Sequence, residues 1–166
     1  MSDTARWATV NTPDGPFTLI ADEADQILAS GWVDDPDYLA ALIHPRIQPQ
    51  TVRPAPLSEL TGAVEAYYAG DHDIVTKVPV RQQSGDFLMH AWDVLRAVDA
   101  GDIVTYSEFA QRAGNAPAIR AAASACARNA AALFVPCHRV VGKSGKLTGF
   151  RYGVDIKRSL LDREAA

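Results

Sequence analysis

The stretch that decides the fold runs from Val104 to Val141 and reads VTYSEFAQRAGNAPAIRAAASACARNAAALFVPCHRVV. Within it, Thr105 and Glu108 form a capping-box pair, which predicts the start of a short helix. Gly114 ends that helix, and the alanine-rich sequence 118–128 favours a second one. A short helix, a glycine turn and a second helix are the spacing of a helix-turn-helix motif.

The second predicted helix has two faces of different composition, and Asn115 is expected to cap it. Small side chains make up one face: Ala118, Ala121, Ala122 and Ala125. Polar and basic side chains line the adjacent face: Arg120, Ser124 and Arg128. A smooth surface beside arginines lets a helix approach a phosphate backbone closely. The alternative is a core helix in which alanine serves tight packing.

Charge is distributed unevenly along the 166 residues. Residues 1–85 carry a net charge of −7, whereas residues 86–166 carry +3. Between Arg112 and Arg158 there are nine basic residues against the single acid Asp155. This excess predicts a surface that binds a polyanion, although a solvated basic face has the same composition.

The sequence Pro136-Cys137-His138-Arg139 follows an apolar run and carries the candidate chemistry. A cysteine with a pKa of about 8.5 is only about 3% thiolate at pH 7, so a nucleophilic cysteine needs a proton acceptor such as histidine. Adjacency does not prove that the two side chains meet. A buried structural cysteine is an alternative interpretation of Cys137. A metal site is not favoured, because the two cysteines, Cys126 and Cys137, and the four histidines do not have the spacing of metal ligands.

The rest of the chain predicts an α/β protein with an N-terminal domain at 1–80 and a C-terminal domain at 86–166. The sequence has 48% hydrophobic residues and no apolar run of membrane-spanning length, so we expect no membrane contact, a cytoplasmic location and free thiols. The expected N-terminal elements are strands at 7–10, 17–21, 27–33 and 74–80, helices at 36–43 and 57–70, and a surface connection at 44–56. A helix at 87–98, with a C-cap at Gly101, opens the second domain.

The segment Pro136–Val140 resembles the active-site pentapeptide of the O6-alkylguanine-DNA alkyltransferases, also called methylated-DNA–protein-cysteine methyltransferases. The match continues without a gap over roughly residues 86–166, and it is looser at 12–19. This resemblance implies a ribonuclease-H-like antiparallel sheet with a helix at the N-terminus. It also implies a mainly helical C-terminal domain with the helix-turn-helix.

The same resemblance assigns roles to residues of the motif. Cys137 would accept the alkyl group, and His138 would be its general base, linked through a water molecule to Glu164. Leu160, Leu161 and Glu164 share one helical face, so the carboxylate should point inward and needs a partner.

Further roles concern the DNA. Tyr106 would act at the departing guanine and help to displace the 3′ phosphate, Arg120 would replace the flipped nucleotide in the base stack, and Asn129 would join the recognition helix to the active-site turn. The full expected DNA-contacting set is Tyr106, Ala118, Arg120, Ala121, Ala122, Ser124 and Arg128. The expected substrate pocket comprises Val135, Phe150, Arg151, Tyr152 and Val154; Phe150, Arg151 and Tyr152 depart from the family pattern.

The function implied is DNA repair by a single irreversible transfer of an alkyl group, chiefly methyl, from O6 of guanine to Cys137. The partner would be double-stranded DNA, bound through its minor groove, with the damaged base flipped out. No metal or cofactor is expected, and neighbouring copies on DNA are expected to contact one another. The alternatives are a non-catalytic alkylated-DNA-binding module and a cysteine hydrolase or redox protein.

Overall fold

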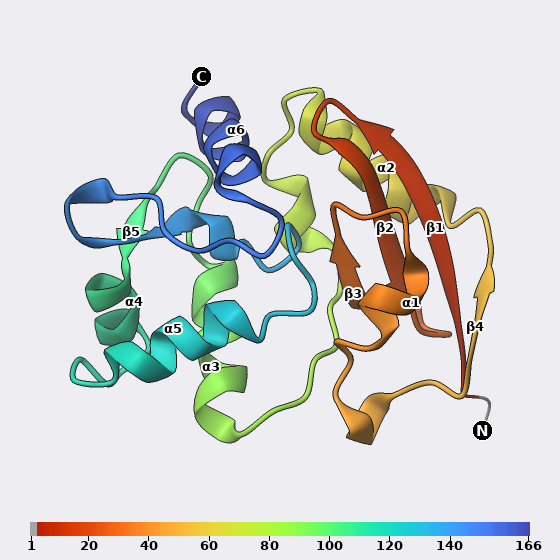
Figure 1. Ribbon diagram of the computed structural model, residues 1–166, viewed down its shortest axis with the longest axis horizontal. Coiled ribbons are helices and arrows are strands. Elements are labelled where there is room, and N and C mark those ends of the chain that lie inside the picture. The colour runs from red at the N-terminus through yellow and green to blue at the C-terminus, as the bar shows by residue number, and fades with distance from the viewer. Residues whose placement is uncertain (1–2) are drawn as a thin grey trace. The chain divides into compact units, whose positions relative to one another are not determined.

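The computed structural model describes residues 3–166 and divides the chain into two compact units (Figure 1). The first unit comprises the chain up to Gln83 together with Ala130–Phe134. The second comprises Ser84–Asn129 and Val135–Ala166. The expected domains at 1–80 and 86–166 are continuous ranges, whereas each unit consists of two segments.

The sheet of the first unit has the strand order β3-β2-β1-β4. The antiparallel hairpin of β1 (Thr4–Thr12) and β2 (Gly15–Ala21) confirms the strands expected on either side of the turn, and β3 (Ile27–Gly31) pairs antiparallel with β2. The expectation for 44–56 was wrong in part, because β4 (Thr51–Pro54) pairs parallel with β1. It is an edge strand, where a proline is tolerated.

Two helices accompany this sheet. As predicted, Asp35 caps α1 (Pro36–Ala40), its side chain accepting the backbone N–H groups of Asp37 and Tyr38. The second helix, α2 (Ser58–Tyr68), lies within the predicted range. The strand expected at 74–80 is wrong, since Ile74–Lys77 forms a 3₁₀ turn and only Val80 bridges to Ile27.

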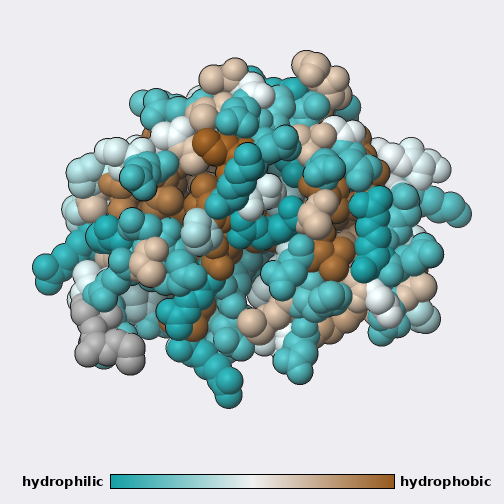
Figure 2. Space-filling view, turned by 180° about the vertical axis from the view of Figure 1, so that it is seen from behind, coloured by the Kyte–Doolittle hydropathy of each residue, from teal (hydrophilic) through white to brown (hydrophobic). Residues whose placement is uncertain are grey.

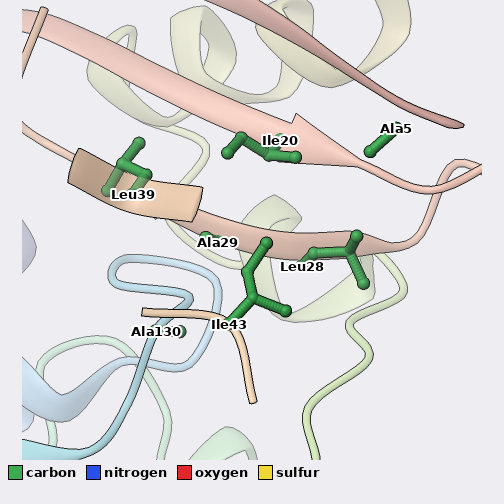
Figure 3. Packing of buried hydrophobic residues seen from close by; sticks show 7 residues of the cluster. All are labelled: Ala5, Ile20, Leu28, Ala29, Leu39, Ile43 and Ala130. Carbon is green, nitrogen blue, oxygen red and sulfur yellow. The ribbon is translucent and has the colours of Figure 1, made fainter. Parts of the chain in front are cut away.

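Part of the core of the first unit lies where β1, β2, β3 and α1 bring apolar side chains together (Figure 3). The cluster consists of Ala5, Ile20, Leu28, Ala29, Leu39, Ile43 and Ala130. Ala130 comes from the returning segment 130–134, so that segment shares the core of the first unit.

The second unit is mainly helical, as expected. Its helices are α3 (Asp86–Arg96), α4 (Tyr106–Arg112), α5 (Ile119–Ala127) and α6 (Val154–Ala165), and its two short strands, β5 (Val104–Thr105) and β6 (Val140–Val141), pair in parallel. The capping box of Thr105 and Glu108 at the start of α4 is confirmed. Ala118 rather than Asn115 is the N-cap of α5, and Ala97 rather than Gly101 is the C-cap of α3.

The hydropathy of the surface is consistent with the burial of the apolar side chains. Hydrophilic side chains cover most of the face shown in Figure 2, with hydrophobic ones in several smaller patches. In the part of the chain that is described, no helix has the length and apolar character that crossing a membrane requires.

Candidate active site

Cys137 begins a 3₁₀ turn, Cys137–Arg139, that leads directly into β6. Its backbone N–H donates to the carbonyl of Val135 at 2.8 Å, and the residue is 8% exposed. Strand β6 pairs with β5, and Tyr106 directly follows β5. The backbone hydrogen bonds of this pairing connect the segment that carries Cys137 with the segment that carries Tyr106. Two residues that lie 31 positions apart are therefore connected through one short sheet.

The two residues after Cys137 form a buried ionic cluster with Glu164 of α6. His138 Nε2 is 2.7 Å from Glu164 Oε2, and both side chains are fully buried. Arg139, 1% exposed, donates through Nε to Glu164 Oε1 at 2.8 Å and through Nη2 to Oε2 at 3.2 Å. Its Nη1 donates to the carbonyl of Val98 at 2.7 Å. The inward carboxylate on α6 is thus confirmed, but the expected water link between His138 and Glu164 is wrong, because the two side chains bond directly.

Protonation in this cluster follows from its burial and its charges. Burial alone would raise the pKa of Glu164, but His138 and Arg139 hold it far below its usual range, so the side chain is a carboxylate. Burial lowers the pKa of His138, against the opposing attraction of Glu164, so the imidazole is neutral at rest. A neutral ring that donates Nε2–H to the carboxylate keeps Nδ1 unprotonated. Within residues 3–166, Nδ1 has no hydrogen-bond partner.

The environment of the thiol balances burial against nearby donors. Burial raises the pKa of Cys137, whereas a hydrogen bond from Asn129 and the charges of Lys157 and Arg151 lower it. Burial prevails, so the resting group is a thiol. Asn129 is itself buried, and its Nδ2 donates to the carbonyl of Val135 at 2.8 Å. This contact ties the end of α5 to the residue that precedes Pro136 and Cys137, as the sequence predicts for Asn129.

Tyr106 is the first residue of α4 and is half-buried. Burial raises the pKa of its phenol, and a hydrogen bond with Thr148 acts in the opposite direction. The phenol is therefore protonated at neutral pH and is able to donate a proton or a hydrogen bond. The negative charge of a Cys137 thiolate would raise the pKa of the phenol further.

The orientation of α5 corrects one expectation about the DNA-contacting set. Ala122 and Ala125 are fully buried, so they pack inside the second unit rather than on a surface that could touch DNA. The alanines of α5 therefore do not form one exposed face. Composition could not predict this, because alanine is compatible with tight packing and with exposure. The remaining members lie at the surface: Arg120 and Arg128 are exposed, and Ala118, Ala121 and Ser124 are half-buried.

Three of the residues expected to line a substrate pocket, Phe150, Arg151 and Tyr152, lie in the loop before α6. Val135 is buried, whereas Val154 begins α6 and is 44% exposed. The rings of Phe150 and Tyr152 pack edge to face with centroids 5.8 Å apart. Arg151 is exposed and donates to the carbonyl of Ala127 at 2.6 Å, which joins this loop to the end of α5.

Sequence reasoning missed Arg139 and Lys157 as site residues. Lys157 is 1% exposed, donates to the carbonyl of Thr148 at 3.1 Å, and interacts electrostatically with Cys137. Each had a signal in the sequence. Arg139 is a charge inside an apolar run, and Lys157 lies seven residues before Glu164 on the inward face of α6. Among residues 3–166, no group of three or more His, Cys, Asp or Glu side chains is arranged to hold a metal ion.

Comparison with known proteins agrees with this geometry. Residues 86–166 match the family described as 6-O-methylguanine DNA methyltransferase, DNA binding domain. A methylated-DNA–protein-cysteine methyltransferase of Shigella flexneri is 30% identical over 158 residues, which cover 93% of this chain and 92% of that protein. The corresponding Kluyveromyces lactis protein is 40% identical over 99 residues, which cover 59% of this chain and 52% of the K. lactis protein.

Solved structures give the same answer for the fold. The crystal structure of Mycobacterium tuberculosis OGT in complex with DNA superposes with a TM-score of 0.77 at 31% identity. That match covers 98% of this chain and 92% of the M. tuberculosis chain. Together with the full-length similarity to the Shigella protein, it shows that this chain belongs to the methylated-DNA–protein-cysteine methyltransferase family.

Proposed function

We propose that this protein repairs DNA by moving an alkyl group, chiefly methyl, from O6 of guanine to the Sγ atom of Cys137. One observation carries the proposal: Cys137 is followed by a buried histidine whose imidazole is held by a buried carboxylate at 2.7 Å. This arrangement suits a thiol that must be deprotonated only when an electrophile is present. Membership of the family supplies the class of substrate.

The displacement is a single in-line substitution at carbon. The S–C bond forms as the bond between the alkyl carbon and guanine O6 breaks, and the electron pair of the broken bond stays on guanine. In this proposal Tyr106, whose phenol is protonated at neutral pH, donates the proton that makes guanine a better leaving group. A thioether has no facile hydrolytic exit, so each molecule reacts once.

We infer that the thiol proton passes to His138. His138 Nδ1 is unprotonated at rest, and the imidazolium that forms when it accepts a proton is stabilised by Glu164. Asn129 and Lys157 stabilise the thiolate on the other side of the transfer. Arg139 keeps Glu164 ionised before His138 becomes charged, and its own positive charge opposes protonation of His138.

The target carbon is inaccessible inside a stacked duplex, so the base must be flipped out, which costs a few kcal/mol. The exposed Arg120 at the start of α5 supports a role as the group that fills the vacated stack. We infer that α5 binds the minor groove, with Arg120, Arg128, Ala118, Ala121 and Ser124 toward the DNA. The DNA complex of the similar M. tuberculosis protein supports a DNA partner.

Two broader expectations stay predictions. One is contact between neighbouring copies bound along DNA, for which the acidic first half and basic second half of the sequence supply opposite charges. The other is a cytoplasmic location.

Intact mass spectrometry tests the proposed reaction. After incubation with a duplex containing O6-methylguanine, the chain should gain one adduct of about 14 Da, since methyl replaces hydrogen on sulfur, and peptide mapping should place it on Cys137. Cys126→Ser should gain the same mass, whereas Cys137→Ala should bind the duplex and gain none. Binding without an adduct in the wild type would point to a non-catalytic DNA-binding module, and repeated turnover of small esters to a hydrolase.

A further inference from the structure

The five residues between Asn129 and Val135 belong to the first unit, although both flanking residues belong to the second. The chain leaves the second unit after Asn129 and returns at Val135, two residues before Cys137. At the point of return, Asn129 Nδ2 donates to the carbonyl of Val135 at 2.8 Å. Segment 130–134 is therefore a loop whose two flanking residues, Asn129 and Val135, are both parts of the candidate active site.

Two polar side chains of the first unit hold this loop. Ser30 donates through its backbone N–H to the carbonyl of Ala130 at 2.8 Å and through Oγ to the carbonyl of Ala132 at 2.7 Å. Gln82 Oε1 accepts the backbone N–H of Ala130 at 2.9 Å. Ser30 is 0% exposed, so water does not compete for its two bonds.

Apolar contacts hold the same loop from other directions. Ala130 lies beside Ile43 and Ala29 in the core cluster (Figure 3). The ring of Phe134 packs against that of Phe17 with centroids 6.2 Å apart. Both ends of segment 130–134 are thus anchored in the first unit.

The backbone of the segment also has a conformation that depends on support. Leu133 is fully buried and has φ +77°, in the left-handed region that a leucine rarely adopts. Such a conformation persists only where surrounding contacts determine it. The conformation of Leu133 therefore depends on the contacts that segment 130–134 makes with Ser30, Gln82 and Phe17.

We propose that Ser30 and Gln82 are positioning residues for alkyl transfer. By fixing segment 130–134 they fix, through the covalent chain, the placement of Asn129 and Val135 and hence of the Cys137 thiol. The predicted effect of Ser30 and Gln82 on the rate of alkyl transfer rests on the proposed function. Their effect on the thiol itself requires no DNA.

The test uses Ser30→Ala with Thr18→Val as a matched control, both in the full-length chain carrying Cys126→Ser. Thr18 lies in β2, is 0% exposed, and its hydroxyl donates to the carbonyl of Val33 at 2.7 Å. Each substitution removes one buried hydroxyl from the first unit. Of these two hydroxyl groups, only that of Ser30 is bonded to segment 130–134.

Two measurements separate positioning from stability. The first is the single-turnover rate of methyl transfer from an O6-methylguanine duplex, which Ser30→Ala should lower about tenfold, the effect of one lost buried hydrogen bond at the transition state. The second is the pH midpoint of Cys137 alkylation by iodoacetamide. Displacing Asn129 removes a hydrogen bond that favours the thiolate, so the midpoint should move to higher pH.

Thr18→Val should leave both values unchanged while lowering the melting temperature by a similar amount. For Gln82, the Gln82→Glu variant keeps an acceptor oxygen and should retain the wild-type rate within about twofold, whereas Gln82→Met should slow transfer. Equal slowing in Ser30→Ala and Thr18→Val, with an unmoved alkylation midpoint, would overturn the proposal. If the wild type takes up no methyl group, the proposed function fails, and the alkylation midpoint alone decides the role of Ser30.

Discussion

Replacing Glu164 by glutamine tests the buried ionic cluster most directly. The change is nearly isosteric, and the glutamine carbonyl oxygen can still accept the Nε2–H of His138. It removes the charge, however, and leaves Arg139 as a cation that is only 1% exposed. Three hydrogen bonds to the carboxylate, at 2.7, 2.8 and 3.2 Å, become bonds to a neutral amide at best.

The expected loss of stability is large because one charge stays buried without its counter-charge. Breaking a buried ion pair from one side costs about 3–5 kcal/mol. For a chain of this length, each kcal/mol corresponds to about 2–4 °C, so the melting temperature should fall by about 6–20 °C. Alkyl transfer should also slow, because the His138 imidazolium loses the charge that stabilises it.

A double-mutant cycle measured by urea unfolding isolates the pair. Arg139→Met should be destabilised as well, while the double variant Glu164→Gln/Arg139→Met should lose less than the sum of the two single losses, since no unpaired charge remains. A loss below about 1 kcal/mol in Glu164→Gln, or strict additivity in the cycle, would refute the assignment of a tightly coupled buried pair.

The pH dependence of stability adds an independent check with a definite sign. The pKa of Glu164 is depressed in the folded state, so its contribution is fully present above the unfolded value of about 4.3 and is lost as the pH falls below it. The difference in unfolding free energy between the wild type and Glu164→Gln should therefore shrink as the pH is lowered from about 5. A difference that grows on acidification would contradict this linkage.

Three further predictions concern the thiol and its substrate. Arg120→Ala should slow transfer from duplex DNA far more than from free O6-methylguanine, because only the duplex requires base flipping; equal slowing in a comparison of the two rates would exclude that role. Tyr152→Gly should raise the rate from O6-benzylguanine relative to O6-methylguanine by about 5- to 150-fold if the ring beside Phe150 restricts the pocket, and an unchanged rate ratio would remove it as a gate. Lys157→Met removes a charge that lowers the pKa of Cys137, so the pH midpoint of iodoacetamide alkylation should rise, and an unmoved midpoint would contradict the coupling.

Local signals in the sequence predicted the elements whose determinants are close together. The capping box of Thr105 and Glu108 and the Asp35 cap of α1 are examples, because each pairs groups within three positions. The parallel strand β4 was missed, since it depends on pairing with β1, where Thr4 lies 47 positions from Thr51. Neighbouring prolines made its sequence look like a connection.

The site shows the same distinction between local and distant determinants. The pattern of Leu160, Leu161 and Glu164 predicted an inward carboxylate, and burial required a partner. It could not predict that Arg139 shares this carboxylate while bonding to the carbonyl of Val98, 41 positions away. Nor could composition orient α5, because its alanines suit a core as well as a surface.

The shortest sheet in the molecule, the two-residue pairing of β5 with β6, has a consequence for timing. It joins the residue before Tyr106 to the strand that follows Cys137, His138 and Arg139. The pairing therefore connects Tyr106 and Cys137 through backbone hydrogen bonds that do not involve α5. We therefore expect the slow event in repair to be the search for a damaged base and its extrusion from the duplex. A protein that reacts only once benefits if its reactive groups are already in place when the damaged base enters the site.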